Sequence, residues 1–282
     1  MTFREALAYG ASVLSEIDGK TDARILLKHC AGNMTDVQFL LSMDGAAADD
    51  IFCEYDKLLR RRAAREPLQY IIGSVPFLSC EITADERALI PRPETEYMAE
   101  ICVRELKNRA AAGDRRCMIL DLCTGSGAIA AAIKKALPSA VVHACDISVG
   151  ALSLAKRNAA RNYCEIDFFH GDLFSAVRDN IYDVIITNPP YISSSELDGL
   201  QEEVKREPIL ALDGGEDGLD LIRRIAGEAS TRLTNDGIIY VEIGFDQSDK
   251  AKELFGRHFR DVRIINDLAG IPRIVAARKP RS

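Results

Sequence analysis

An apolar segment, a turn of small residues and an alanine-rich segment follow one another between residues 118 and 137. The first segment, residues 118–122, has the composition of a buried parallel strand, and the last predicts a helix that Pro138 ends. Gly125 and Gly127 lie in the turn, where the absence of a side chain lets a ligand approach the backbone closely. The first turn of the helix would offer free N–H groups to that ligand. The segment therefore predicts an α/β fold with a ligand cradle at the end of a strand.

Strand and helix patterns continue to alternate toward the C-terminus. Further strands are expected over residues 140–146, 166–170, 182–187, 238–243, 261–266 and 273–277. Helices are expected from Ser148 to about Arg161, from about Gly218 to Leu233 and from Asp246 to about Phe255. The loop over residues 267–272 is too short for a helical crossover, so the last two strands should pair antiparallel. This pattern predicts a doubly wound, mostly parallel, seven-stranded sheet with helices on both faces.

The N-terminal region carries a different pattern, with apolar residues at helical spacing. One helix is expected to open at Thr21 and Asp22, and another to start near Ala48. Residues 68–72 and 77–83 are interpreted as the two strands of a hairpin. We therefore expect a small helical domain over residues 1–67, a hairpin linker over residues 68–90 and the α/β domain over residues 91–282.

The tetrapeptide Asn188-Pro189-Pro190-Tyr191 directly follows the expected strand over residues 182–187. Ligands of open α/β sheets bind beyond the carboxyl ends of such strands. The prolines stiffen the loop and leave carbonyl groups unpaired, so these carbonyls and the Asn188 side-chain oxygen can hold a planar NH2 group. Tyr191 adds an aromatic face for stacking. Taken alone, the tetrapeptide is more typical of a strand that prolines end, so it must be weighed together with the glycine-rich turn.

Two interpretations of the glycine-rich turn compete. Gly125, Gly127 and Ala130 satisfy the dinucleotide pattern G-x-G-x-x-A, which suits a nicotinamide or flavin enzyme. Asp121 precedes the glycines, however, and a carboxylate aimed into the cradle repels a pyrophosphate but suits an ammonium group. S-adenosylmethionine carries that ammonium group and no phosphate. Asp146 ends the next strand, where it can accept hydrogen bonds from ribose hydroxyls, so the two acids favour S-adenosylmethionine.

Several further motifs accompany the turn and the tetrapeptide. They are E-P-L-Q-Y-I-I-G at 66–73, I-P-R-P-E-T-E at 90–96, E-P at 207–208, A-L-D-G-G at 211–215, D-G-L at 217–219, E-I-G at 242–244 and D-L-A-G-I-P-R at 267–273. With them the chain resembles, over essentially its whole length, the class I S-adenosylmethionine-dependent methyltransferases. Within that class it resembles the bacterial release-factor glutamine N5-methyltransferases. N-P-P-Y is shared with enzymes that methylate adenine or guanine, whereas P-R-P-E-T-E together with A-L-D-G-G is much narrower.

One departure from that family is visible in the turn. The family's common loop is D-L-G-T-G, and Cys123 stands here at the third position. A cysteine is not expected to adopt the positive φ that glycine allows there unless the backbone is strained. We expect the substitution to alter the detailed geometry of the loop and not the identity of the cofactor.

The resemblance implies an activity. A methyl group of S-adenosylmethionine would pass to the side-chain amide nitrogen (N5) of the glutamine in the Gly-Gly-Gln motif of peptide chain release factors. Asn188, Pro189 and Tyr191 would be catalytic, since the first two orient the NH2 group and the tyrosine bounds the amide plane. Together with Pro190 they would also bind the substrate. No base is assigned, because the nitrogen becomes acidic once methylated and can lose its proton to water.

The cofactor is expected to contact three strand ends and the tetrapeptide. The first strand end would surround the methionine part, the second would hold the ribose and one side of the adenine, and the third would flank the adenine amine. The expected cofactor residues are Asp121, Leu122, Cys123, Thr124, Gly125, Gly127, Asp146, Ile147, Asp172, Leu173 and Asn188.

The net charge of the protein bears on which class of substrate it can bind. The net charge is −7, whereas enzymes that act on bare nucleic acid usually need a basic face. Arg60, Arg61, Arg62 and Arg65 form a candidate basic patch, although such a run is more typical of the exposed C-terminal end of a helix. The acidic balance favours a protein substrate and no direct contact with nucleic acid.

The 8 cysteines are scattered without C-x-x-C spacing and the 4 histidines do not cluster with them, so neither a metal site nor a disulfide framework is indicated. No long uncharged apolar run and no signal peptide are seen. We therefore expect a cytoplasmic, monomeric enzyme that contacts no membrane. Two other functions remain open: N-methylation of an exocyclic amine of adenine or guanine in nucleic acid, and non-catalytic binding of S-adenosylmethionine or a nicotinamide cofactor.

Overall fold

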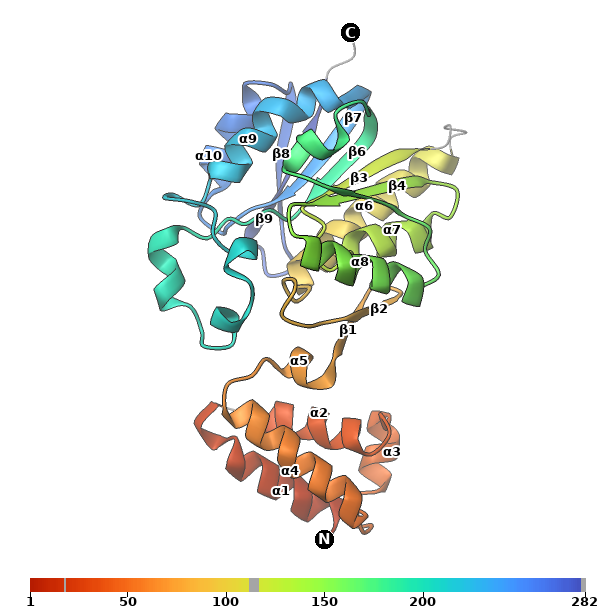
Figure 1. Ribbon diagram of the computed structural model, residues 1–282, viewed down its shortest axis with the longest axis vertical. Helices are drawn as coiled ribbons and strands as arrows, with labels where there is room; N and C mark the ends of the chain where they lie inside the picture. The colour runs from red at the N-terminus through yellow and green to blue at the C-terminus, as the bar shows by residue number, and fades with distance from the viewer. Residues whose placement is uncertain (18, 112–116, 280–282) are drawn as a thin grey trace. The chain divides into compact units, whose positions relative to one another are not determined.

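The computed structural model describes residues 1–17, 19–111 and 117–279. The chain forms two compact units, drawn mainly from red to orange and from orange to blue in Figure 1. The first unit comprises Met1–Gly73 and, from much later in the chain, Gln201–Arg206. The second unit comprises Ser74–Leu200 and the residues from Glu207 onward.

The first unit is helical. Its helices are α1 (Phe3–Val13), α2 (Lys20–Cys30), α3 (Asp36–Leu41), α4 (Asp49–Ala63) and α5 (Leu68–Ile72). Thr2 caps α1, because its hydroxyl accepts a hydrogen bond from the backbone N–H of Glu5, whose carboxylate accepts one from the N–H of Thr2. The apolar faces of the helices meet in one core around Leu26, Phe39 and Tyr55. The helical pattern predicted for this region is confirmed.

The hairpin strand predicted over residues 68–72 is wrong. These residues form α5, which Gly73 ends with a φ of +82° and a hydrogen bond from its N–H to the carbonyl of Gln69. The hairpin lies just beyond it, in β1 (Ser74–Phe77) and β2 (Cys80–Thr83), which pair antiparallel. A short apolar run has no clear period, so its contacts decide between helix and strand. Here Ile71 is buried in the helical core, and the first unit therefore extends to Gly73.

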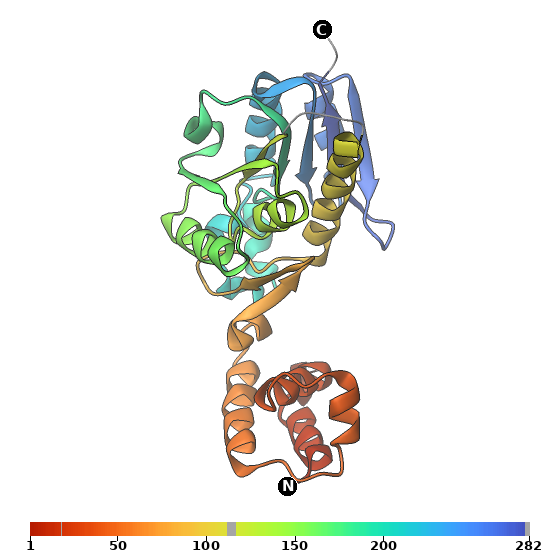
Figure 2. The same cartoon turned by 90° about the vertical axis from the view of Figure 1, so that its right-hand side faces the viewer.

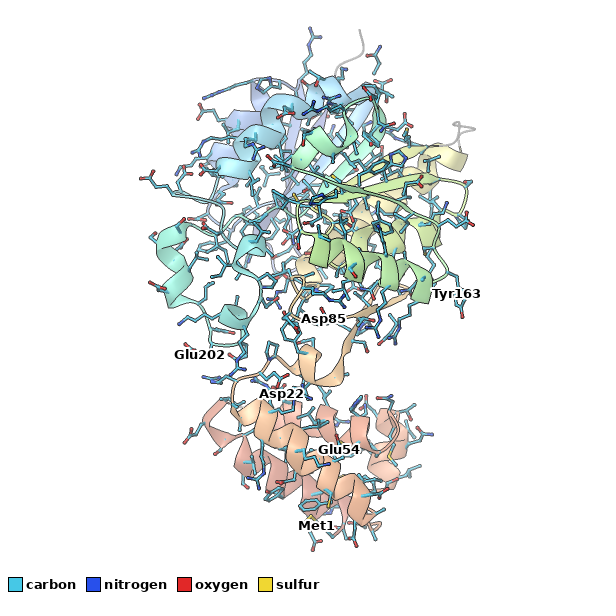
Figure 3. The ribbon with its side chains drawn as sticks, in the orientation of Figure 1. Met1, Asp22, Glu54, Asp85, Tyr163 and Glu202 are labelled. Carbon is cyan, nitrogen blue, oxygen red and sulfur yellow. The ribbon has the colours of Figure 1, made fainter. Side chains whose placement is uncertain are left out.

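The basic run at the end of α4 is neutralised by carboxylates. Arg62 is only 8% exposed and lies between two acids, Asp22, labelled in Figure 3, and Glu203. The ion pairs of the run are Arg60 with Asp56, Arg61 with Glu66, Arg62 with Asp22 and Glu203, and Arg65 with Glu203. These pairs hold the segment Gln201–Arg206 within the helical unit and leave little excess positive charge for a phosphate backbone.

The second unit contains a sheet with the strand order β5-β4-β3-β6-β7-β9-β8. The strands are β3 (Met118–Leu122), β4 (Val141–Asp146), β5 (Asp167–His170), β6 (Tyr182–Thr187), β7 (Leu233–Glu242), β8 (Asp261–Asn266) and β9 (Pro272–Arg278). All neighbours are parallel except β9, which runs antiparallel to both β7 and β8. The predicted doubly wound, mostly parallel, seven-stranded sheet is confirmed. The strand order reverses between β3 and β6, the position at which such sheets bind ligands.

Helices cover both faces of this sheet (Figure 1 and Figure 2). One face packs against α6 (Pro93–Ala111) and α7 (Ala128–Ala136), with α8 (Val149–Arg161) beside α7, and the other packs against α9 (Asp220–Ala229) and α10 (Ser248–Gly256). Successive side chains of β3 alternate between the two cores: Ile119 joins the first, and Leu120 and Leu122 join the second. The last helix before β7 is shorter than expected, because residues 230–232 form a 3-10 turn.

Candidate active site

A cavity of about 330 Å³ lies in the second unit, where the strand order reverses. The turns that follow β3, β4, β5 and β6 all contribute to its wall. The segment before α6, the loop between β6 and α9, and side chains of α6, α7, α8 and α9 also line the cavity. Its size falls within the usual range for a small-molecule site, about 300–1,000 Å³.

Asp121 lies beneath the turn after β3 and does not line the cavity. Its Oδ2 atom accepts hydrogen bonds from the Thr124 hydroxyl, at 2.5 Å, and from the backbone N–H of Ala130, at 3.0 Å. Its Oδ1 atom accepts none from the residues that the structure describes. Complete burial raises the pKa of Asp121 to about 7, against the opposing effect of the two donors.

The turn itself is built around three positive φ angles. Gly125 has a φ of +53° and lines the cavity, whereas Gly127 has a φ of +77° and does not. A Cβ atom at Gly127 would lie 2.9 Å from the Cβ of Ala155 on α8, so this glycine serves the close packing of α7 on α8. Cys123 also takes a positive φ, +59°, contrary to the prediction from its side chain. The neighbouring Thr124 N–H donates to the carbonyl of Cys145 on β4, which holds the turn in this strained form.

The carboxylate of Asp146 ties the end of β4 to two turns. Its Oδ2 atom accepts from the N–H of Gly125 at 2.8 Å, and its Oδ1 atom accepts from the N–H of Ser148 at 2.9 Å. Ser148 in turn caps α8 by accepting from the N–H of Ala151. The carboxylate lines the cavity, and burial, its largest influence, raises the pKa of Asp146. These two hydrogen bonds fix the orientation of the Asp146 carboxylate, and with it the direction of its remaining lone pairs.

Asp172 follows β5 and forms an ion pair across the cavity wall. Its Oδ2 atom lies 2.6 Å from Nη2 of Arg224 on α9, and both residues line the cavity. Ile147, from the turn after β4, is half exposed in the same wall. Sequence reasoning missed Arg224 because no motif surrounds it; only the packing of α9 brings it to the site.

Asn188 belongs to a buried chain of hydrogen bonds at the end of β6. Its Nδ2 atom donates to the hydroxyl of Thr95 at 3.0 Å, and that hydroxyl donates to Oε2 of Glu242 at 2.6 Å. The other carboxylate oxygen accepts from the hydroxyl of Tyr191 at 3.2 Å. Burial, above all other influences, raises the pKa of Glu242 to about 7. Asn188 and Thr95 line the cavity, whereas Glu242 and Tyr191 stand behind it.

The loop beyond Tyr191 is held by contacts between distant motifs. The carboxylate of Glu207 accepts from the N–H of Ile90 at 2.8 Å and pairs with Arg92, which joins E-P to the P-R-P-E-T-E segment. The side-chain amide of Gln247 donates to the carbonyl of Tyr191 at 2.8 Å. These contacts bring segments that are far apart in sequence to one wall of the cavity.

The structure brings most predicted site residues together at the cavity, but not all. Those that line it are Cys123, Thr124, Gly125, Asp146, Ile147, Asp172, Leu173, Asn188 and Pro190. Those that do not are Asp121, Leu122, Gly127, Pro189 and Tyr191. Lining residues that sequence reasoning did not assign include Ser126, Ile129, Ser148, Leu210, Leu221 and Arg224. Thr95 was quoted only as part of a motif, although its place in P-R-P-E-T-E was the available signal.

Within residues 1–17, 19–111 and 117–279, no group of three or more His, Cys, Asp or Glu side chains could hold a metal ion. In the same part of the chain, no helix has both the length and the apolar character needed to cross a membrane.

Comparison with known proteins identifies the family. The family model of the PrmC N-terminal domain matches residues 5–73, and the family model of the methyltransferase small domain matches residues 96–206. The release factor glutamine methyltransferase of Neisseria gonorrhoeae is 36% identical over 281 residues, 99% of this chain and 98% of that protein. Its counterpart from Thermodesulfovibrio yellowstonii is 40% identical over 228 residues, 80% of this chain and 81% of that protein. The N-terminal domain of human METTL16 in complex with SAH shares the fold, with a TM-score of 0.53 and 17% identity over 79% of this chain and 84% of that one. The chain therefore belongs to the release factor glutamine methyltransferase family.

Proposed function

We propose that this protein transfers a methyl group from S-adenosylmethionine to N5 of the glutamine in the Gly-Gly-Gln motif of peptide chain release factors. One observation carries the proposal: the amide of Asn188 lines the cavity with its NH2 group bound to Thr95, which leaves Oδ1 as an acceptor. An acceptor is what a substrate NH2 group requires. The names of the relatives supply the class of substrate.

The residues around the cavity fit S-adenosylmethionine. Gly125 lets a ligand approach the backbone, and Asp146 presents a carboxylate for the ribose hydroxyls. The Oδ1 atom of Asp121 has no partner among the described residues but is buried beneath the turn, so the carboxylate that faces the ligand and opposes a pyrophosphate is that of Asp146. Asp172, Ile147 and Leu173 are proposed to flank the adenine. When bound, S-adenosylmethionine supplies a methyl group on a positively charged sulfur, and its transfer to the amide nitrogen breaks the carbon–sulfur bond.

The chemical difficulty lies in the substrate, because the lone pair of an amide nitrogen is delocalised into its carbonyl group. Asn188 Oδ1 and the carbonyl of Pro189 are proposed to accept the two hydrogens of the substrate NH2 group and to orient its nitrogen toward the methyl group. Positioning of this kind can supply up to about 7–11 kcal/mol of the barrier. Tyr191 is proposed to bound the amide plane. Its hydroxyl donates to Glu242, which keeps the ring in place. No residue is assigned as a base, since the methylated nitrogen can release its proton to water.

The helical unit is proposed to recognise the release factor, because a three-residue target offers too little surface for selective binding. Paired arginines on α4 and the net charge of −7 give little support to methylation of adenine or guanine in nucleic acid. None of the eight cysteines, all of which lie in the described residues, forms a disulfide, which is consistent with action in the reducing cytoplasm. We propose that the enzyme acts there as a monomer.

The test is incubation with methyl-labelled S-adenosylmethionine and, in separate reactions, a purified release factor, transfer RNA, ribosomal RNA and duplex DNA. We expect label only in the release factor, and peptide mass spectrometry should place it on the glutamine of Gly-Gly-Gln. A release factor whose motif reads Gly-Gly-Ala is the matched control. Label in nucleic acid but not in protein would refute the proposal, as would absence of label in every reaction.

A further inference from the structure

The buried chain of hydrogen bonds behind Asn188 joins three elements that are far apart in sequence. Asn188 follows β6, Thr95 lies in the first turn of α6, and Glu242 ends β7. Thr95 is 5% exposed and Glu242 is 1% exposed. Glu242 does not line the cavity, and both of its oxygens already accept hydrogen bonds, from Thr95 and Tyr191. It is therefore poorly placed to take a proton from a substrate.

The carboxylate of Glu242 sets the direction of donation along this chain of hydrogen bonds. When Glu242 is ionised its carboxylate can only accept, so the single hydrogen of the Thr95 hydroxyl points to it. The oxygen of that hydroxyl must then act as an acceptor toward Asn188, 3.0 Å away. Only the NH2 group of the asparagine can satisfy it. The opposite orientation of the Asn188 amide would place two acceptors against each other at hydrogen-bond distance, which is repulsive.

We infer that Thr95 and Glu242 are positioning residues, which fix the orientation of the Asn188 amide so that its Oδ1 atom, and not its NH2 group, faces the substrate. This inference rests on the proposed function of Asn188. A flipped asparagine would present a donor to the hydrogens of the substrate amide and would repel them. The acid is needed because a neutral partner would not impose a direction on the threonine hydroxyl.

Glu242→Gln is the sharpest perturbation, because it preserves the shape of the side chain. The new amide can donate from its nitrogen to the Thr95 oxygen and accept the Tyr191 hydroxyl on its own oxygen. The Thr95 hydroxyl is then free to donate to Oδ1 of Asn188 and so to stabilise the flipped orientation. We expect kcat for a release factor to fall about 10- to 100-fold, the scale of a mispositioned catalytic group, with little change in affinity for S-adenosylmethionine.

Thr95 offers a matched pair of variants. Thr95→Val removes the hydroxyl at nearly constant volume and should lower kcat to a similar extent. Thr95→Ser keeps the hydroxyl and should retain most of the activity. If Thr95→Val does not fold, as judged by circular dichroism, Thr95→Ala takes its place.

Combination with Asn188→Ala separates positioning from a general structural role. If Thr95 and Glu242 act through Asn188, their substitutions should have no further effect on the single-turnover rate of Asn188→Ala. Wild-type enzyme is measured first. If it does not methylate the release factor, the proposed function fails and this inference falls with it. If wild type is active, then full activity of Glu242→Gln and Thr95→Val, or an equal loss with and without Asn188, overturns the inference alone.

Discussion

The buried carboxylate of Glu242 makes stability depend on pH in a direction that can be worked out. Its pKa is raised from an ordinary value of 4.5 to about 7, chiefly because burial disfavours the charged form. One pKa unit corresponds to about 1.4 kcal/mol, so full ionisation should cost the folded state about 3 kcal/mol relative to the unfolded chain. The folded state binds the proton more tightly. Stability should therefore fall as the pH rises from about 4.5 through 7 and level off above that.

Glu242→Gln removes this titration without removing the hydrogen-bonding shape. We expect the free energy of unfolding of the variant, relative to wild type, to rise by about 2.5 kcal/mol between pH 5 and pH 8.5. Urea denaturation of both proteins at each pH, followed by circular dichroism, gives the four values that are needed. The contributions of other titrating groups cancel in the difference. An unchanged difference between the two pH values would refute the assigned burial and pKa of this carboxylate.

Three further predictions concern the cavity. Asn188→Ala should lower methyl transfer at least about 100-fold, the scale of one deleted preorganised catalytic hydrogen bond, with little change in cofactor affinity; unchanged turnover would contradict the role of the loop. Asp146→Ala should weaken S-adenosylmethionine binding by about 1.5–3 kcal/mol in calorimetry, and tight binding of NAD to the wild type would instead favour the dinucleotide interpretation. Cys123→Gly should remove the strain of a left-handed backbone conformation, which costs about 1–2 kcal/mol, and should retain cofactor binding. Cys123→Val should instead lower the melting temperature. Equal melting temperatures for the two variants would show that the φ of +59° is not strained.

The sequence predicted the sheet well because a strand buried on both faces carries a local signal. Each of the expected strands in the second unit appears, and the short loop before β9 correctly predicted its antiparallel pairing. Motifs at the ends of those strands identified much of the cavity wall for the same reason, since the carboxyl ends of parallel strands share one edge of the sheet.

Local patterns failed where contacts between distant segments decide the conformation. Residues 68–72 became a helix because Ile71 packs into the helical core, and Cys123 took a positive φ because its neighbour is bound to β4. Period and composition cannot report such contacts. The segment Gln201–Arg206 likewise joined the helical unit through ion pairs of Glu203 with Arg62 and Arg65 and a hydrogen bond from Arg206 to the carbonyl of Ala64.

The features of the active site divide in the same way between those that local sequence predicts and those that tertiary contacts decide. The sequence by itself determined the parallel sheet, the cradle after its first strand and the asparagine that lines the cavity at the end of β6, because each is written in adjacent residues. Only the tertiary structure decided that Asp121 lies beneath the cradle and that Arg224 reaches Asp172. It also decided that Thr95 and Glu242 stand behind Asn188, because the direction of a hydrogen bond depends on which groups folding brings within 3 Å of each other.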